Sequence, residues 1–147
     1  MKPDLKDPKF QTLIVFISIL FFLVSLFVNG FSIDKSPTPH GWSKGWALVS
    51  LGWMGFLSGK AIYILPWLAN PLYIASICFY FLKKRISFYL GLLAIIFSIL
   101  FTFTMKIPNN ENGQVSDVIT LESGYFLWLG SMVLAAISAS QIKYRNH

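Results

Sequence analysis

Residues that carry catalysis are scarce in this chain of 147 residues, which has six acidic residues, two histidines and one cysteine. Enzymes need a cluster of titratable or nucleophilic side chains, and metal sites need several ligands at suitable spacing. The sequence has no H-E-x-x-H motif, no paired cysteines, no glycine-rich phosphate loop and no G-x-S-x-G elbow. We therefore predict no catalytic site, no metal and no cofactor. The single cysteine, Cys78, lies in an apolar run, where we predict a packing role.

Charge is also scarce, because 12% of the residues are charged whereas 55% are hydrophobic and 17% aromatic. A soluble domain has about 25% charged residues. Four uncharged runs, residues 10–29, 61–82, 86–105 and 125–141, are long enough to cross a hydrocarbon layer of about 30 Å as helices. The sequence thus predicts an all-α integral membrane protein, with residues 1–147 forming one four-helix bundle. The polar stretch 106–123 is predicted to be a turn-rich loop.

Basic residues are distributed unevenly between the two ends of the predicted bundle. Short loops rich in Lys and Arg stay on the cytoplasmic side of a membrane. Eight of the twelve basic residues lie at the end that carries both termini and the turn between residues 82 and 86. We predict that both termini are cytoplasmic. The formal charge of +6 then reflects topology, and no binding of nucleic acid is predicted.

A cleavable signal peptide is the alternative for the first span, because a basic start precedes its apolar stretch. The apolar run is longer than the roughly 7 to 15 residues usual in such a segment, and Asp4 and Asp7 dilute the positive charge. We favour a retained span. Cleavage would leave three spans and an outside amino terminus.

Small and polar residues form a stripe at helical spacing on three of the predicted spans. Helices in lipid associate through small residues that allow close approach and through polar side chains that bond across. We predict that the stripes pack inside the bundle, since no ionisable residue near mid-span indicates an ion pathway. They consist of Gln11, Ser18 and Ser25 with Asn29 in the first span, Ser87, Gly91, Ala94, Ser98 and Thr102 in the third, and Ser131, Ala135 and Ala139 in the fourth.

Residues 42–59, before the second span, place tryptophans on one face of a helix. Trp42, Trp46 and Trp53 are separated by four and seven residues, and glycines follow nearly the same period one residue away. A glycine inside a helix costs about 1 kcal/mol relative to alanine, so we expect the glycine strip to pack closely against the bundle. We predict an outer helix at the membrane surface or a re-entrant segment. An aromatic belt is the favoured role, and a surface for a partner or lipid is the alternative.

The second predicted span contains Pro66 and Pro71, which each remove a backbone donor. We predict a kinked or partly unwound helix in which Asn70 bonds the freed groups, with polar residues of the first or third span nearby. Broken helices at membrane depth hold substrates in transporters, so the stretch from Pro66 to Pro71, with Trp67 and Asn70, is the predicted small-ligand site. A structural kink is favoured, because the other half of the chain has no matching break.

Two short segments are similar to parts of small, uncharacterised bacterial inner-membrane proteins. They are Trp-Leu-Ala-Asn-Pro at residues 67–71 and Gly-Tyr-Phe-Leu-Trp-Leu-Gly-Ser at residues 124–131. The resemblance covers about two of the four predicted spans. It implies a bacterial inner membrane and no particular activity.

These patterns favour a noncatalytic multi-pass membrane protein that works in the lipid bilayer by contacting another membrane protein or a second copy of itself. The role would be that of an accessory subunit, an assembly factor or an immunity-type protector. The alternative is a small transporter or lipid-binding protein that uses the broken second span, and a membrane enzyme comes third. The candidate contact residues are Trp42, Trp46, Trp53, Pro66, Trp67, Asn70 and Pro71.

Overall fold

Four long helices make up most of the fold. The structure, a computed structural model, describes residues 7–33, 43–53, 56, 61–104, 106–108 and 115–141. The helices are α1 (Pro8–Phe27), α3 (Ala61–Phe81), α4 (Ile86–Thr104) and α5 (Ser123–Ser140). All four are long and apolar enough to cross a membrane. Their ends agree with the predicted spans to within two residues.

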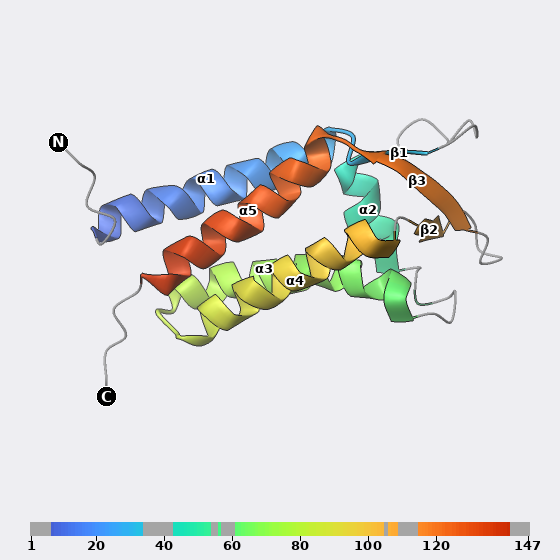
Figure 1. The fold of residues 1–147 in the computed structure, drawn as a ribbon. Coiled ribbons are helices and arrows are strands. Elements are labelled where there is room, and N and C mark those ends of the chain that lie inside the picture. The colour runs from blue at the N-terminus through green and yellow to red at the C-terminus, as the bar shows by residue number, and fades with distance from the viewer. Residues whose placement is uncertain are drawn as a thin grey trace.

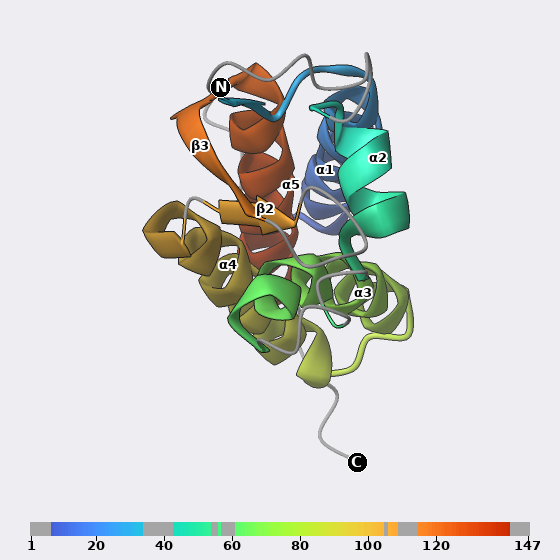
Figure 2. The same cartoon turned by 90° about the vertical axis from the view of Figure 1, so that its right-hand side faces the viewer.

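The long helices form two pairs that pack against each other (Figure 1). α1 lies along α5, and α3 lies along α4. Contacts between α4 and α5 join the pairs, as the view along the helices shows (Figure 2). The start of α1, the end of α5 and the α3–α4 turn lie at one end of the bundle. We call this the inner end, and the opposite end, which carries a short helix and a small sheet, the outer end.

Helix α1 begins at an N-terminal capping motif. Oδ1 of Asp7 accepts a hydrogen bond from the backbone N–H of Lys9 at 2.9 Å. Pro8 occupies the first turn, where its missing N–H would have had no helical partner. This cap explains why the helix starts two residues before the apolar run.

The predicted stripes face the interior of the bundle. On each of the three helices the residues at helical spacing are buried, whereas Asn29, beyond the end of α1, is exposed and Thr102 is half-buried. The buried members are Gln11, Ser18 and Ser25 on α1, Ser87, Gly91, Ala94 and Ser98 on α4, and Ser131, Ala135 and Ala139 on α5. The exposed faces carry large apolar side chains such as Phe16 and Leu20.

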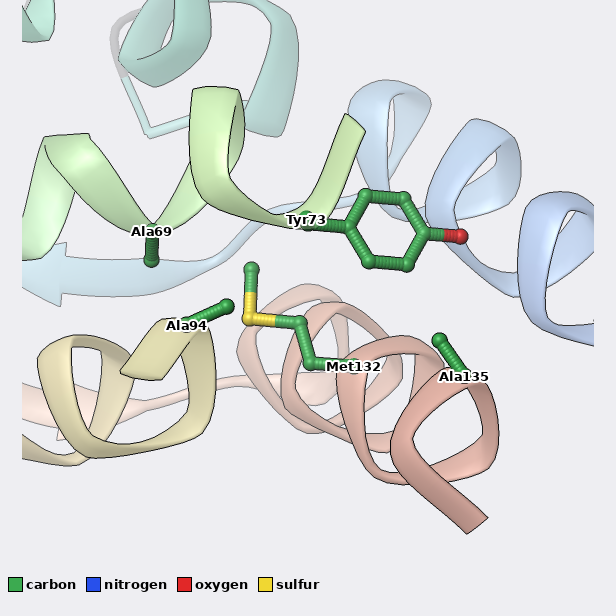
Figure 3. Packing of buried hydrophobic residues seen from close by; sticks show 5 residues of the cluster. All are labelled: Ala69, Tyr73, Ala94, Met132 and Ala135. Carbon is green, nitrogen blue, oxygen red and sulfur yellow. The ribbon is translucent and has the colours of Figure 1, made fainter. Parts of the chain in front are cut away.

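Met132 of α5 lies at the centre of the contact between α3, α4 and α5. Its side chain is fully buried and reaches between Ala69 of α3 and Ala94 of α4 (Figure 3). Tyr73 and Ala135 complete this cluster. The alanines let the helices approach closely, and the flexible thioether fills the space that remains.

A three-stranded antiparallel sheet at the outer end was not predicted. It consists of β1 (Phe31–Ile33), β2 (Lys106–Pro108) and β3 (Val115–Leu121), in the order β1-β3-β2. β2 and β3 lie within residues 106–123, the predicted polar loop. The fold is therefore mostly helical rather than all-α. β1 and β2 have three residues each, too few to show the alternation of polar and apolar residues from which strands are recognised. β3 has seven residues, but its apolar positions 115, 118, 119 and 121 do not alternate regularly with polar ones.

Cys78 lies on the exposed side of α3, so the prediction that it packs inside was wrong. Ser76 and Tyr80 are buried and mark the inner face of this helix. Successive residues of a helix are rotated by about 100° about its axis. Cys78 is two residues from both Ser76 and Tyr80, so it lies on the opposite side of α3.

Candidate functional site

The predicted outer segment 42–59 is described in part, since residues 42, 54, 55 and 57–59 lie outside the described residues. α2 covers Gly45–Leu51, and a further helical turn includes Gly52 and Trp53. It runs across the outer ends of the long helices and not parallel to them (Figure 1).

Aromatic side chains project from this segment. Trp46 and Trp53 are each 48% exposed, and Phe56 is 72% exposed. Ala47, by contrast, is buried. We call Trp46, Trp53 and Phe56 the outer aromatic surface. Trp42 lies outside the described residues.

Two glycines bring the segment against the bundle. A Cβ atom at Gly45 would overlap the carbonyl oxygen of Ser25 on α1 and lie 2.9 Å from its carbonyl carbon. A Cβ atom at Gly52 would lie 2.5 Å from Cδ1 of Trp67 on α3. The predicted glycine strip is thus confirmed at these two positions, because only a residue without a side chain allows such an approach.

Residues 28–30 connect α1 to both neighbouring elements through the backbone. The N–H of Gly30 donates to the carbonyl of Ser43 at 2.7 Å, just before α2. The N–H groups of Glu122 and Gly124 donate to the carbonyls of Gly30 and Asn29, each at 2.9 Å, at the start of α5. The base of the outer segment is therefore tied to two of the long helices.

Trp67 attaches the other end of α2 to α3. Its indole Nε1 donates to the carbonyl of Val49 at 2.8 Å. That carbonyl belongs to the last turn of α2, where helical carbonyls have no partner within their own helix. One tryptophan thus provides both the surface on which Gly52 packs and a hydrogen bond that fixes the helix end.

Asn70 repairs the hydrogen bonding that Pro71 interrupts. In a regular helix the carbonyl of Trp67 would accept from the N–H of residue 71, which proline lacks. The side-chain Nδ2 of Asn70 donates to that carbonyl instead, at 3.1 Å. The predicted role of Asn70 is confirmed. The helix itself is continuous from residue 61 to 81 and is not unwound at either proline.

The second partner of Asn70 differs from the prediction. Its Oδ1 accepts from the indole Nε1 of Trp128 on α5 at 2.8 Å, so the neighbouring polar group lies on the fourth span and not on the first or third. Sequence analysis missed Trp128. The available signal was an indole N–H in the middle of an apolar helix, a donor that needs a partner when buried.

The predicted ligand residues are therefore engaged in structural contacts. A continuous series of hydrogen bonds runs from Val49 of α2 through Trp67 and Asn70 to Trp128 of α5. Asn70 is buried, and Pro66 is buried whereas Pro71 is exposed. The structure joins Trp67 to Asn70 through a hydrogen bond and leaves Trp46 and Trp53 on the outer surface.

A second group of polar residues joins three helices near the middle of the bundle. Ser18 of α1 donates through Oγ to the carbonyl of Ser131 on α5 at 2.7 Å, and lies 2.9 Å from the hydroxyl of Tyr73 on α3. The Tyr73 hydroxyl points from α3 toward α1 (Figure 3). Phe22 stacks on the Tyr73 ring with centroids 4.9 Å apart. Sequence analysis missed Tyr73 as the partner of the serine stripe.

The buried polar side chains of the described residues mostly donate to backbone carbonyls, some in their own helix and some in a neighbouring one. In the part of the chain that the structure describes, Oγ of Ser138 is the one buried side-chain nitrogen or oxygen atom without a hydrogen-bond partner. Across the same residues, no group of three or more His, Cys, Asp or Glu side chains is placed to hold a metal ion. The arrangement serves helix cohesion.

The fold is that of a small, mostly helical protein with four helices long and apolar enough to span a membrane. No family model, curated protein or solved structure matches the chain. Its function is therefore inferred from the two features described above, the bonded interior and the exposed outer aromatic surface.

Proposed function

We propose that this chain is a noncatalytic membrane protein that acts by binding another membrane protein through its outer aromatic surface. In this proposal α1, α3, α4 and α5 cross a bacterial inner membrane, and both termini are cytoplasmic. The inward stripes, the apolar outer faces and the excess of basic residues at the inner end support this topology. An accessory, assembly or immunity-type role follows.

The contacts of α1 favour a retained span over a cleaved signal peptide. Ser18 bonds to groups on both α3 and α5, and Val15 is fully buried. Without α1, the Tyr73 hydroxyl would lose its hydrogen bond with Ser18 and the interior would face lipid. A segment that is removed would not need such contacts.

The fixed position of exposed aromatic side chains is the observation that carries the proposal. Trp46 and Trp53 are half exposed, yet their segment is held by α1 at Gly45 and by α3 at Gly52. A belt of tryptophans at the headgroups of a fluid bilayer does not require a fixed orientation relative to the bundle. A protein interface benefits from one, because a preorganised surface loses less entropy on binding and tryptophan is enriched among its strongest contacts.

The alternative of a small transporter or lipid-binding protein that uses the second span has less support. Both polar atoms of the Asn70 side chain already bond to protein groups. α3 is continuous, so it presents no unwound backbone to a solute. A transport role would require these bonds to break during each cycle.

Site-specific photo-crosslinking in intact cells tests the proposal. A photoreactive phenylalanine analogue replaces Trp46 or Trp53, and the same analogue at Phe16 or Leu20 of α1, which are 58% and 57% exposed, serves as the matched control. We expect a discrete protein adduct from the two outer positions and only lipid adducts from the controls. The Trp46→Ala, Trp53→Ala double variant should reduce recovery of the same complex at least tenfold, as expected when two strong contacts are lost.

Other adducts would contradict the proposal. If both outer positions gave lipid adducts alone, the outer aromatic surface would contact the bilayer and not a partner protein. An adduct of twice the mass of the chain would show that the partner is a second copy of the same chain. Loss of solute uptake in Asn70→Ala, with normal insertion and an unchanged complex, would favour transport.

A further inference from the structure

The turn between α3 and α4 places a lysine where glycine is usual. The N–H of Lys84 donates to the carbonyl of Phe79 at 3.0 Å, and the N–H of Lys83 donates to the carbonyl of Tyr80 at 2.9 Å. This pair of bonds closes a helix as a Schellman motif, whose left-handed position favours glycine. Lys83 occupies that position with φ 53° and is the one non-glycine residue with positive φ in the described chain. The backbone strain suggests that its charge is needed there.

Three exposed cations follow one another in this turn. They are Lys83, Lys84 and Arg85, which we call the basic turn. Exposed apolar side chains flank it on both sides: Phe81 (52%), Leu82 (63%) and Ile86 (48%). Because only residues 82–85 separate the two helices, the charges cannot extend far beyond the ends of the spans. Their apolar neighbours would lie among acyl chains, and the cations would then lie at the depth of the headgroup phosphates.

No acidic residue neutralises this charge from its own helices. The sequence has no Asp or Glu between Asp34 and Glu111, a stretch that includes α3, the turn and α4. Among the described acids, Asp7 lies at the inner end, where its carboxylate caps α1 by accepting from the N–H of Lys9. Asp117 and Glu122 belong to the outer end, at β3 and at the start of α5. The three cations are thus available to an anion from outside the chain.

We propose that the basic turn binds the phosphate groups of anionic phospholipids in the leaflet that it faces. Lysine and arginine donate charge-assisted hydrogen bonds to phosphate, and arginine can do so with two parallel bonds. Each basic residue close to an anionic membrane surface increases binding about fivefold, so three cations give a preference on the order of 100-fold. This inference rests on membrane insertion, as proposed above, and does not depend on the protein partner.

Lipid binding to the purified chain in neutral detergent micelles tests the inference. Phosphatidylglycerol and phosphatidylcholine with the same acyl chains are titrated separately, and native mass spectrometry counts the lipids retained. We expect a preference for phosphatidylglycerol on the order of 100-fold in the natural sequence and its loss in Lys83→Gln, Lys84→Gln, Arg85→Gln. The matched control, Lys35→Gln, Lys44→Gln, Lys60→Gln, removes the same charge elsewhere and should change the preference by less than about twofold, because it leaves the basic turn intact.

The outcomes that overturn the inference are distinct. A preference that survives in the basic-turn variant, or falls equally in both triple variants, would show that the turn is not the site. Displacement of phosphatidylglycerol by an equal concentration of inorganic phosphate would show a site for free phosphate and not for lipid. If carbonate extraction releases the natural chain from membranes, the proposed function fails as well; retention without a lipid preference overturns the lipid inference alone.

Lys83→Gly separates the charge from the backbone strain. Glycine fits the left-handed position, so this variant should fold and should unfold at a higher temperature than the natural chain. It lacks one cation, so its preference for phosphatidylglycerol should fall about fivefold. An unchanged preference would overturn a role for Lys83 in binding lipid, and an unchanged or lower unfolding temperature would overturn the argument from strain.

Discussion

The interior of the bundle and its outer end are held together by different means. In the interior, Ser18 and Asn70 bond across to neighbouring helices, and their helices meet through small residues. At the outer end, α2 is attached by close glycine contacts, by backbone hydrogen bonds and by Trp67, while its aromatic side chains remain exposed. The interior therefore uses its polar groups for cohesion, and the outer end leaves its large side chains available for binding.

This difference predicts that substitutions in the two regions have separate consequences. Damage to the attachment of α2 should abolish partner binding even when the four long helices stay assembled. Damage to the interior should lower stability. It should reduce partner binding only in proportion to the fraction of the chain that no longer folds. The variants below test this separation, from the largest expected effect to the smallest.

Gly45→Ala should have the largest effect. Its Cβ would overlap the Ser25 carbonyl, so α2 must move away from α1. We expect a loss of about 2–3 kcal/mol in the free energy of unfolding, which is the upper end of the usual cost of overpacking. The crosslink from Trp46 should also be lost. Unfolding in mixed micelles containing sodium dodecyl sulfate, followed by tryptophan fluorescence, measures the stability.

Gly130→Ala is the matched control for that substitution. A Cβ at Gly130 of α5 would lie 3.8 Å from Phe21 Cδ2, an ordinary van der Waals distance. Removing a glycine from a helix should therefore stabilise the chain by about 0.5–1 kcal/mol without affecting the crosslink. If Gly45→Ala and Gly130→Ala changed stability in the same direction, the close approach of α2 to α1 would be wrong.

Asn70→Ala should have an intermediate effect, located in the interior. It removes the bonds to the Trp67 carbonyl and to the Trp128 indole, and it leaves both groups without those partners. We expect a loss of about 1–2 kcal/mol in the free energy of unfolding, because each side-chain hydrogen bond between membrane helices contributes only about 0.6 kcal/mol on average. The same mixed-micelle unfolding measures it.

Pro71→Ala provides a specific control for the repair of the helix by Asn70. Alanine restores the N–H that the Trp67 carbonyl lacks, and residue 71 is exposed, so no cavity forms. In that background Asn70→Ala should cost about half as much, because only the bond to Trp128 is then lost without replacement. Equal costs in the two backgrounds would contradict the repair.

The four long helices and their inward stripes could be predicted because they depend on local spacing. Ser87, Ala94 and Ser98 share a helix face whatever the neighbouring helix is, and that face proved to be buried. The bond from Asn70 to the Trp67 carbonyl was also predictable, since Asn70 directly precedes Pro71. These inferences need only one helix and its geometry.

Features that depend on contacts between distant segments were not predictable. Trp128 is 58 residues from Asn70, and nothing in the spacing of either residue identifies the other as its partner. β1 and β3 pair Phe31 with Leu121 across most of the chain, and neither the three residues of β1 nor the irregular polar pattern of β3 identifies this pairing. The exposure of Cys78 was not predictable for a similar reason: the sequence of an apolar helix does not show which of its sides packs against another helix.

The smallest effect is expected where α3 and α4 join near the inner end. Oγ of Ser76 donates to the carbonyl of Ser87, and Oγ of Ser87 donates to the carbonyl of Ser76, both at 2.8 Å. Ser76→Ala and Ser87→Ala should each lower the free energy of unfolding by about 0.6 kcal/mol, the average for such bonds between membrane helices. The exposed Ser140, which bonds within α5 to the carbonyl of Ile137, is the control, and Ser140→Ala should change stability by less than about 0.3 kcal/mol.

The two serine bonds also test whether the interior is a set of separate contacts. Ser76 and Ser87 are in direct contact, so the loss in the double variant should differ from the sum of about 1.2 kcal/mol by about 0.5 kcal/mol or more. Asn70→Ala and Trp128→Phe remove the same bond, so their losses should overlap. Both measurements use the same mixed-micelle unfolding, with the Trp46 crosslink as the second readout. If the crosslink disappeared in a serine variant that remained folded, the interior would contribute to binding and the separation between the two regions would not hold.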